Sequence, residues 1–210
     1  MGSAESSVAD IRAELQSYYE EEASRGLRRP SVTGPRLDLR DQFIRRLATE
    51  HRRRAVDFGA GPGRDLAGFA AAGVEAVGID LAHGNGVLAA QAGLTVIQGS
   101  VLAPPFRPQS VDAGWSMSTL MHLPADQMAV AVGAMAGVLT DRAPLWIGMW
   151  GGDFGDRVDE TIAGQKRRFF HRPLATNREI LATVGTIERA EEWDFGDAGH
   201  YHAFAVCVRS

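Results

Sequence analysis

The segment from Ala55 to Asp65 constrains the fold most, because an apolar strand there runs directly into glycines. Gly59, Gly61 and Gly63 stand at alternate positions, and a helical pattern follows them. Glycine tolerates positive φ and leaves the space of a Cβ free, so a ligand can touch the backbone. The following helix presents unpaired N–H groups and the positive end of its dipole. The segment therefore predicts a loop that holds a nucleotide-like ligand.

Strand and helix patterns alternate from about residue 53 onward. The predicted strands are Arg54–Phe58, Ala76–Ile79, Leu94–Ile97, Ala113–Met117 and Pro144–Met149. The predicted helices are one with Leu66, Phe69 and Ala70 on its inner face, Val87–Gln91 and Ala125–Leu139. Near-continuous apolar strands separated by helices indicate a parallel sheet that is covered on both faces.

The pattern changes toward the C-terminus. A helix is predicted over Thr176–Val184, followed by an extended segment, Thr186–Phe195, and a strand, His202–Val208. The short turn Gly196–Gly199 makes the last two strands antiparallel. The predicted fold class is α/β: a doubly wound, Rossmann-like sheet of seven strands, mostly parallel, with an antiparallel C-terminal hairpin strand.

Two amphipathic helices precede this core. Ile11, Leu15, Tyr18 and Tyr19 recur at helical spacing, and a second helix is predicted over Leu37–Glu50. We predict that residues 1–52 form a helical cap or lid of the same domain, and that residues 53–210 form the core. Aromatic residues at helical spacing are more often core than ligand contacts, so both roles stay open for Tyr18 and Tyr19.

Composition limits the class of protein. The 210 residues, 45% of them hydrophobic, suffice for one well-buried domain and are few for two. A formal net charge of -4 gives no general attraction to nucleic acid or anionic membrane. The one cysteine, Cys207, suits a reducing compartment. No apolar run approaches the roughly 20 residues of a membrane span, and the N-terminus does not resemble a secretory signal. We predict a soluble, cytoplasmic protein.

The motifs resemble those of the class I S-adenosylmethionine-dependent methyltransferases. Val56–Gly63 resembles the family's first motif, Gly78–Asp80 its second and Ser110–Ser116 its fourth, while Leu145–Met149 stands at the position of the fifth. With the terminal hairpin, the resemblance covers about three quarters of the chain. It implies a methyltransferase of the EC 2.1.1 class, with S-adenosyl-L-methionine as cofactor and S-adenosyl-L-homocysteine as product.

The resemblance also implies roles for matched positions. Asp57 would organise the loop and the amino group of the cofactor, and Asp80 would accept from both ribose hydroxyls. The cofactor-binding candidates are Asp57, Gly59, Ala60, Gly61, Gly63, Asp80, Leu81, Ser100, Val101, Trp115 and Ser116. For Trp115, a place beside the cofactor and a buried core position are both open. Asp65 is interpreted as a first-turn acid that complements the helix dipole.

Residue chemistry supports an adenosine ligand independently. Asp80 follows Gly59 by twenty-one positions, at the tip of the second strand, where a carboxylate can accept from two ribose hydroxyls. This spacing also fits an NAD(P)-dependent Rossmann oxidoreductase, and a non-catalytic S-adenosylmethionine-binding protein stays open as well. The loop is G-x-G-x-G rather than G-x-G-x-x-G, and Asp57 would repel a pyrophosphate, which favours the methyltransferase.

One position departs from the family pattern. Many members carry an acid after the third strand that contacts the adenine amino group, and Ser100 stands in its place. The hydroxyl could accept the same hydrogen bond, with a loss of about 1 kcal/mol relative to a charged acceptor, or nearby backbone could make the contact instead.

Methyl transfer is an in-line displacement at an activated carbon, so the protein mainly has to align the acceptor and exclude water. A base is needed only if the acceptor has a proton to lose. The candidates are His122, which follows the fourth strand and could also be a packing or capping residue, and His171, in a segment that resembles a family substrate loop. The acceptor-pocket candidates are Tyr18, Tyr19, Trp150, Asp153 and Phe154. No metal site is predicted.

The acceptor is predicted to be a small organic molecule, with the methylated atom and the oligomeric state left open. The fourth strand continues into Ser116–Thr119, without the acid or amide, two prolines and aromatic common in enzymes that methylate nucleic-acid bases. Two basic runs, His51–Arg54 and Lys166–Arg168 with Arg172, could contact an anionic group or phosphate backbone, or be solvated charges. Solvation is favoured for both.

Overall fold

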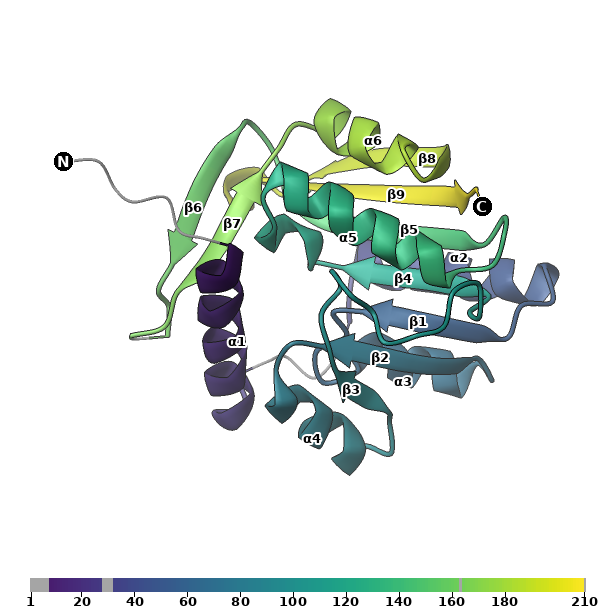
Figure 1. The fold of residues 1–210 in the computed structure, drawn as a ribbon, viewed down its shortest axis with the longest axis horizontal. Coiled ribbons are helices and arrows are strands. Elements are labelled where there is room, and N and C mark those ends of the chain that lie inside the picture. Colours follow the sequence, from purple (N-terminus) through teal and green to yellow (C-terminus); the bar gives the residue numbers. More distant parts are fainter. Residues whose placement is uncertain (1–7, 28–31, 163, 210) are drawn as a thin grey trace.

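The computed structural model describes residues 8–27, 32–162 and 164–209, which form an α/β fold around one large sheet (Figure 1). The helices are α1 (Val8–Ser24), α2 (Pro35–Thr49), α3 (Arg64–Ala71), α4 (His83–Gln91), α5 (Ala125–Val138) and α6 (Leu174–Ala182), with 3-10 turns η1 (Leu120–His122) and η2 (Gly196–Ala198). The strands are β1 (Arg54–Phe58), β2 (Glu75–Asp80), β3 (Val96–Gln98), β4 (Ala113–Met117), β5 (Pro144–Gly151), β6 (Gly155–Asp159), β7 (Arg167–His171), β8 (Gly185–Asp194) and β9 (His200–Val208).

The sheet confirms the predicted fold class. It has seven strands in the order β3-β2-β1-β4-β5-β9-β8. The first five pair in parallel, and β9 is antiparallel to both β5 and β8. Figure 1 shows α5 and α6 over one face and α2 and α3 over the other. Strands β4 and β5 are buried almost throughout because both of their faces are covered, which explains their unbroken apolar sequence.

Element boundaries agree best in the parallel half. Strands β1 and β4 begin and end at the predicted residues. The inner face of α3 was predicted wrongly at Ala70, which is exposed. The buried stripe of that helix runs through Asp65, Leu66 and Phe69, and Ala70 lies at its edge.

The hairpin of β6 and β7 was not predicted. It begins four residues after β5 ends and pairs in antiparallel register from Gly155 with His171 to Asp159 with Arg167. Strand β6 is exposed along most of its length, so its sequence carries no alternation of apolar and polar residues. The hairpin lies beside α1, at the edge of the sheet toward which the parallel strands point (Figure 1).

Helix α1 crosses the edge where the parallel strands end, and polar contacts hold it to α4 on one side and to β7 on the other. The Glu20 carboxylate accepts hydrogen bonds from the backbone N–H groups of His83 and Gly84, at 2.6 and 2.8 Å, in the first turn of α4. The Glu14 carboxylate pairs with Arg168 of β7 at 2.7 Å. That residues 1–52 act as a lid of the same domain stays a prediction, and residues 1–7 and 28–31 lie outside the described part of the chain.

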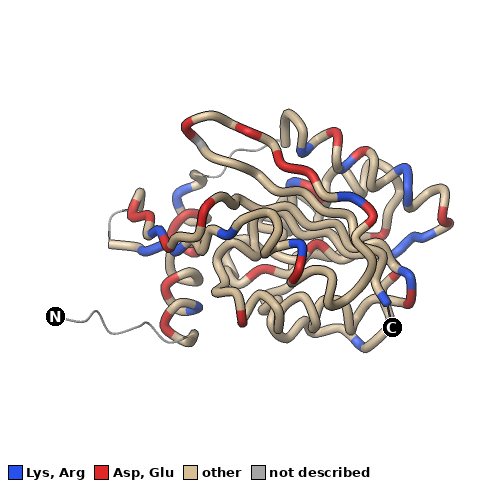
Figure 2. Tube along the Cα trace, turned by 90° about the horizontal axis from the view of Figure 1, so that it is seen from above, with Lys and Arg blue, Asp and Glu red and all other residues tan. Residues whose placement is uncertain are grey.

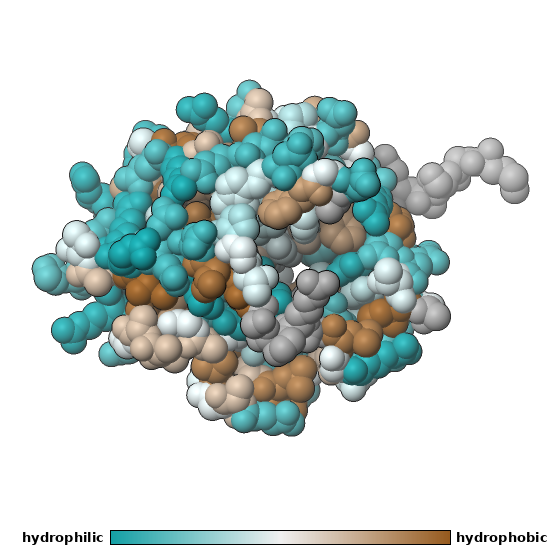
Figure 3. Space-filling model, turned by 180° about the vertical axis from the view of Figure 1, so that it is seen from behind, coloured by the Kyte–Doolittle hydropathy of each residue, from teal (hydrophilic) through white to brown (hydrophobic). Residues whose placement is uncertain are grey.

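Figure 2 shows basic and acidic residues intermixed along the chain. Two arginines of the first basic run make hydrogen bonds or ion pairs within the protein. Arg52 donates to the carbonyl oxygens of Asp112 and Arg142, and Arg54 pairs with the Asp112 carboxylate. On the face seen in Figure 3, hydrophilic residues predominate and the hydrophobic ones appear in separate places. Within the described residues, no helix combines the length and apolar character needed to cross a membrane.

Candidate functional site

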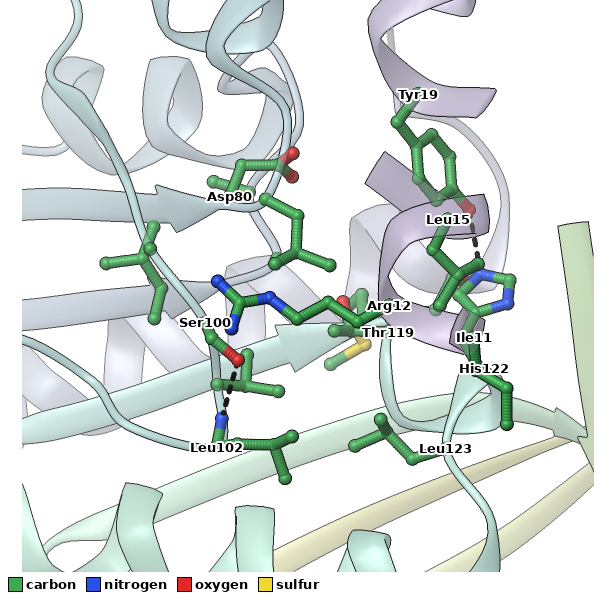
Figure 4. A pocket seen from close by; sticks show the side chains of 18 of the residues that line it. Ile11, Arg12, Leu15, Tyr19, Asp80, Ser100, Leu102, Thr119, His122 and Leu123 are labelled. Carbon is green, nitrogen blue, oxygen red and sulfur yellow. Dashed lines mark hydrogen bonds between the residues drawn. The ribbon is translucent and has the colours of Figure 1, made fainter. Parts of the chain in front are cut away.

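A cavity of about 1070 Å³, counted to its open mouth, lies where the parallel strands end. The loops after β1, β2, β3 and β4 form one side of it, and α1 forms the other (Figure 4). Open α/β sheets bind ligands at this edge. The volume includes space open to solvent, so the position and the lining of the cavity, rather than its volume, make it the candidate binding site.

The glycine loop forms the floor of the cavity. Gly59 and Ala60 line it, and their N–H groups donate to the Ile79 carbonyl at 2.8 and 3.0 Å. Gly59 has φ 81°, and a Cβ there would lie 2.0 Å from the Thr119 hydroxyl oxygen, so the position requires glycine. Gly61 and Gly63 do not line the cavity; Gly63, at φ 83°, precedes α3 as its N-cap.

Asp80 lies at the end of β2 and lines the cavity, as predicted from the sequence. Its Oδ2 accepts from the Gly61 N–H at 2.8 Å, and its Oδ1 accepts from the Ala82 N–H at 3.0 Å and the Asn85 amide at 2.9 Å. A carboxylate has about four lone-pair positions, so roughly one is left for a ligand. Accepting from two ribose hydroxyls would require one of the three internal bonds to open.

Asp65 lies in the first turn of α3, as interpreted from the sequence, and it is also a buried ion-pair partner, which the sequence did not indicate. Asp65 is 1% exposed, pairs with Arg36, lies 3.8 Å from the Arg40 guanidinium and accepts from the Trp115 indole N–H at 2.9 Å. Arg36 lines the cavity, so Asp65 balances that charge from behind. The buried partners lie on α2 and β4, and no local sequence pattern of α3 indicates them.

Asp57 is 2% exposed and does not line the cavity. Its burial, and then the negative charge of Asp65, raise its pKa well above the usual value for a carboxyl group, while Arg36 acts in the opposite direction. The contact of Asp57 with the amino group of the cofactor stays a prediction.

Trp115 and Ser116 lie in the core. Trp115 is fully buried, with its ring centroid 5.1 Å from that of Phe43 and 5.7 Å from that of Phe69. The Ser116 hydroxyl donates to the Phe58 carbonyl at 2.9 Å. Neither residue lines the cavity, because both belong to the body of β4 and only the residues from Met117 onward reach the edge of the sheet.

Leu81, Ser100 and Val101 line the end of the cavity beyond Asp80. The Ser100 hydroxyl oxygen accepts from the Leu102 N–H at 3.2 Å. In Figure 4, the Arg12 side chain extends from α1 toward the side of the cavity where Asp80 and Ser100 lie.

His122 and Tyr19 meet at the opposite end of the cavity, and both line it. The Nδ1 atom of His122 lies 2.6 Å from the Arg168 carbonyl oxygen. Because a carbonyl only accepts, Nδ1 carries the proton and donates it there. The other ring nitrogen, Nε2, lies 2.7 Å from the Tyr19 hydroxyl and accepts its hydrogen bond in the neutral imidazole (Figure 4).

Tyr18 has a different environment from Tyr19. It is 3% exposed, its hydroxyl lies 2.9 Å from that of Thr161, and the Arg167 guanidinium lies 4.7 Å from its ring centroid. It does not line the cavity. The structure therefore places Tyr18 in the packing between α1 and the β6–β7 hairpin.

Four other candidates lie away from the cavity. Strand β5 extends two residues beyond its predicted end, which directs Trp150 onto Tyr201, with ring centroids 5.3 Å apart. Asp153 and Phe154 follow and are exposed. His171 ends β7, where burial and then the charges of Arg157 and Arg172 lower its pKa.

Sequence reasoning missed much of the cavity wall. These lining residues are aliphatic or basic: Val8, Ile11, Arg12, Leu15, Arg36, Arg64, Leu102, Leu123 and Pro124. Ile11 and Leu15 belong to the apolar stripe of α1 that the sequence showed, but only the tyrosines of that stripe were named as pocket candidates. Among the described residues, no group of three or more His, Cys, Asp and Glu side chains is arranged to hold a metal ion.

Comparisons with known proteins agree with this architecture. Residues 55–142 match the family model described as a methyltransferase domain. The structure resembles that of magnesium protoporphyrin IX methyltransferase from Synechocystis PCC 6803 with bound SAM, at 17% identity, covering 98% of this chain and 100% of that one, with a TM-score of 0.72. A search of curated proteins found no match.

Two further structures are similar. One is 1,6-didemethyltoxoflavin-N1-methyltransferase from Burkholderia thailandensis with bound 1,6-didemethyltoxoflavin and S-adenosylhomocysteine, at 19% identity, 100% and 94% coverage of this chain and that one, and a TM-score of 0.66. The other is a complex from Haloferax volcanii between a methyltransferase activator and a putative methyltransferase, at 15% identity, 91% and 98% coverage and a TM-score of 0.64.

Proposed function

We propose that this chain, which carries a methyltransferase domain of the class I S-adenosylmethionine-dependent type, transfers a methyl group from S-adenosyl-L-methionine to a small organic acceptor. The observation that carries the proposal is the cavity itself. It joins the glycine loop and Asp80 at one end to a hydrogen-bonded His122 and Tyr19 at the other.

The residues of the cavity fit this cofactor. Asp80 keeps about one lone pair for a ribose hydroxyl. Gly59 exposes backbone at the floor, and Arg36 offers a cationic group that can bind a carboxylate. S-adenosylmethionine, when bound, supplies a methyl group activated by its sulfonium. The chain has to orient the acceptor against that group and exclude water, and α1, which forms one wall of the cavity, is the element placed to do so.

His122 is the group best placed to take a proton from the acceptor. The bond from Nδ1 to the Arg168 carbonyl fixes the ring and leaves the basic Nε2 directed toward the cavity, where Tyr19 now donates to it. A base that is oriented by a third group is a common arrangement in enzymes. An acceptor O–H or N–H would replace the Tyr19 hydroxyl at Nε2, or pass its proton through that hydroxyl.

The walls near His122 favour a small, largely apolar acceptor. They include Ile11, Leu15, Leu123 and Pro124, and Asp80 is the one acid among the described lining residues. The second basic run offers little for an anionic acceptor or for nucleic acid, because Arg167 pairs with Asp159 and Arg168 with Glu14. Arg172 is buried and donates to the carbonyl oxygens of Leu120 and Leu123.

Titration calorimetry with S-adenosylmethionine, S-adenosylhomocysteine and NADH tests the cofactor. Binding of the two sulfur ligands without NADH is expected. Binding of NADH alone would favour the dinucleotide oxidoreductase, and binding of the sulfur ligands without turnover on any acceptor would favour a non-catalytic binding protein. The cytoplasmic location stays a prediction.

The role of His122 is tested with His122→Asn, whose amide can still donate to the Arg168 carbonyl. A panel of phenols and amines with labelled S-adenosylmethionine is the turnover assay. We expect the rate to fall about 10²- to 10⁴-fold, as for loss of a general base, with S-adenosylhomocysteine affinity retained. An unchanged rate across pH would remove His122 from the mechanism and leave the cofactor assignment intact.

A further inference from the structure

We infer that Arg172 is a positioning residue for His122: it holds the backbone of the η1 turn, so that the imidazole keeps its orientation in the cavity. This role rests on the proposed function, because it concerns the proposed base. Arg172 directly follows β7 and belongs to the second basic run. It does not line the cavity, so its effect on the reaction has to pass through other residues.

The Arg172 guanidinium binds the chain on both sides of His122. Its Nη1 donates to the Leu123 carbonyl at 2.7 Å, and its Nη2 donates to the Leu120 carbonyl at 3.1 Å. The Leu120 carbonyl also accepts from the Leu123 N–H at 3.2 Å, and that bond closes the turn. Because His122 lies between these two residues, a shift of either carbonyl would move the His122 ring.

Strand β7 also fixes the ring itself. The carbonyl of Arg168 accepts from Nδ1 of His122 at 2.6 Å. Residues 168–172 therefore hold both the imidazole and the backbone of His122. If η1 moved relative to β7, the bond at Nδ1 would weaken, and the tautomer with its proton on Nε2 would become accessible. That tautomer cannot take a proton from an acceptor at Nε2.

A buried chain of hydrogen bonds orients the guanidinium. Nε of Arg172 donates to Oδ1 of Asn177 at 3.0 Å, and the Asn177 amide nitrogen donates to Nδ1 of His202, also at 3.0 Å. Nε2 of His202 therefore carries the proton and donates to the Glu192 carboxylate at 2.9 Å. Asn177 is 1% exposed and His202 0%, so water does not compete for the bonds between them.

The charge of Arg172 is unfavourable where it lies. The residue is 3% exposed and forms no ion pair with the residues that the structure describes. Burial lowers its pKa to about 10, so the group is still protonated at neutral pH. An apolar residue would fill this space without the cost of burying a cation, but it could not bind two carbonyls. The retained arginine is therefore explained by its hold on η1.

The test is Arg172→Met, which fills the space and removes the donors. We expect kcat in the turnover assay to fall about 10- to 100-fold, as for a misplaced catalytic group, with S-adenosylhomocysteine affinity within about twofold of wild type. NMR of the histidine ring nitrogens should show His122 changing from the Nδ1–H form to a mixture of tautomers, with its signals assigned by their loss in His122→Asn. An unchanged His122 spectrum in the folded variant would overturn the inference, whatever the rate.

Arg52→Met is the matched control. Arg52 also donates to two backbone carbonyls, those of Asp112 and Arg142, at the ends of the strands opposite the cavity. The control should leave kcat and the His122 spectrum unchanged. A spectrum altered as much as in Arg172→Met would show that any lost arginine loosens η1, and would overturn the specific role of Arg172.

Arg172→Lys keeps the charge and can donate to one of the two carbonyls at a time. It should show the same changes to a smaller extent, and it decides the matter if Arg172→Met does not fold. Failure of both variants to fold would overturn the inference, because Arg172 would then serve the fold as a whole. The NMR measurement needs neither cofactor nor acceptor, so it still tests Arg172 if His122→Asn leaves the rate unchanged and the proposed base fails.

Discussion

The two ends of the cavity are built in different ways. The cofactor end comes mainly from residues 59–102, with Arg12 and Arg36 added from α1 and α2, and is held by backbone hydrogen bonds and one carboxylate. The acceptor end joins side chains of α1 and η1 to the Arg168 carbonyl of β7, and Tyr19 lies 103 positions from His122 in the sequence. A local site depends on the conformation of its own loop, whereas a distributed site depends on how separate elements pack. Substitutions at the two ends should therefore have different effects.

The largest effect is expected behind the cofactor end. Asp65→Ala would leave the Arg36 and Arg40 guanidinium groups and the Trp115 N–H without their buried acceptor. Removing one partner of a buried pair costs about 3–5 kcal/mol of unfolding free energy. Urea denaturation measures it. Asp65→Asn keeps an acceptor for Trp115 and should lose less; equal losses in both variants would show that the charge, and not the acceptor oxygen, carries the stabilisation.

The second-largest effect is expected where the two ends of the cavity touch, at Gly59 and Thr119. Gly59→Ala forces a residue with Cβ to adopt φ 81° and brings that Cβ to 2.0 Å from the Thr119 hydroxyl, in the turn before η1. We expect a loss of about 2–3 kcal/mol of stability, because alanine would be strained in the left-handed backbone region and the Thr119 side chain would have to move. Thr119→Gly in the same chain should recover the steric part. Additive losses in the double variant would contradict a coupling between the ends.

Asp80→Ala tests the cofactor end directly. Loss of a hydrogen bond to a charged acceptor should weaken S-adenosylhomocysteine by roughly 1–3 kcal/mol, or about 5- to 150-fold in the dissociation constant. Calorimetry on protein whose fold is verified by circular dichroism measures it. Asp80→Asn is the matched control, because it keeps an oxygen acceptor without the charge. Wild-type affinity in the folded Ala variant would contradict the placement of the ribose.

Tyr19→Phe tests the acceptor end. It removes the part-buried hydrogen bond to His122, so we expect a loss of about 1 kcal/mol of stability and cofactor affinity close to wild type. Tyr18→Phe removes the bond to Thr161 at the other side of the helix and is the control. If Tyr19→Phe weakened S-adenosylhomocysteine as strongly as Asp80→Ala, the two ends would not be separate.

The smallest effect concerns acidic pH. His171 has a lowered pKa in the folded chain, mainly because of burial, so the neutral ring contributes stability above the unfolded value of about 6.5. That contribution is lost as the pH falls below about 6.5 through the folded pKa. His171→Gln should flatten this part of the stability profile, measured by urea denaturation between pH 5 and 8, without changing cofactor affinity. A steeper profile in the variant would contradict the sign.

Prediction from sequence succeeded where the signal is local. The strand, glycine loop and helix around Gly59 follow from apolar runs, positive φ and capping chemistry, and Asp80 follows from its spacing to the loop. Trp115 shows the limit, because a tryptophan in a motif strand can point to the cavity or to the core. The packing of α2 and α3 against that face of the sheet places it in the core.

The sequence by itself determined the α/β class, the order of the strands in the chain, the glycine loop and the carboxylate at the tip of β2, since each depends on residues close together in the chain. Only the tertiary structure decided that Asp65 is a buried ion-pair partner, that α1 forms a wall of the cavity, and that Tyr19 bonds to His122. These contacts join residues on different elements. They are set by which faces are buried together when those elements pack, and no local pattern records that choice.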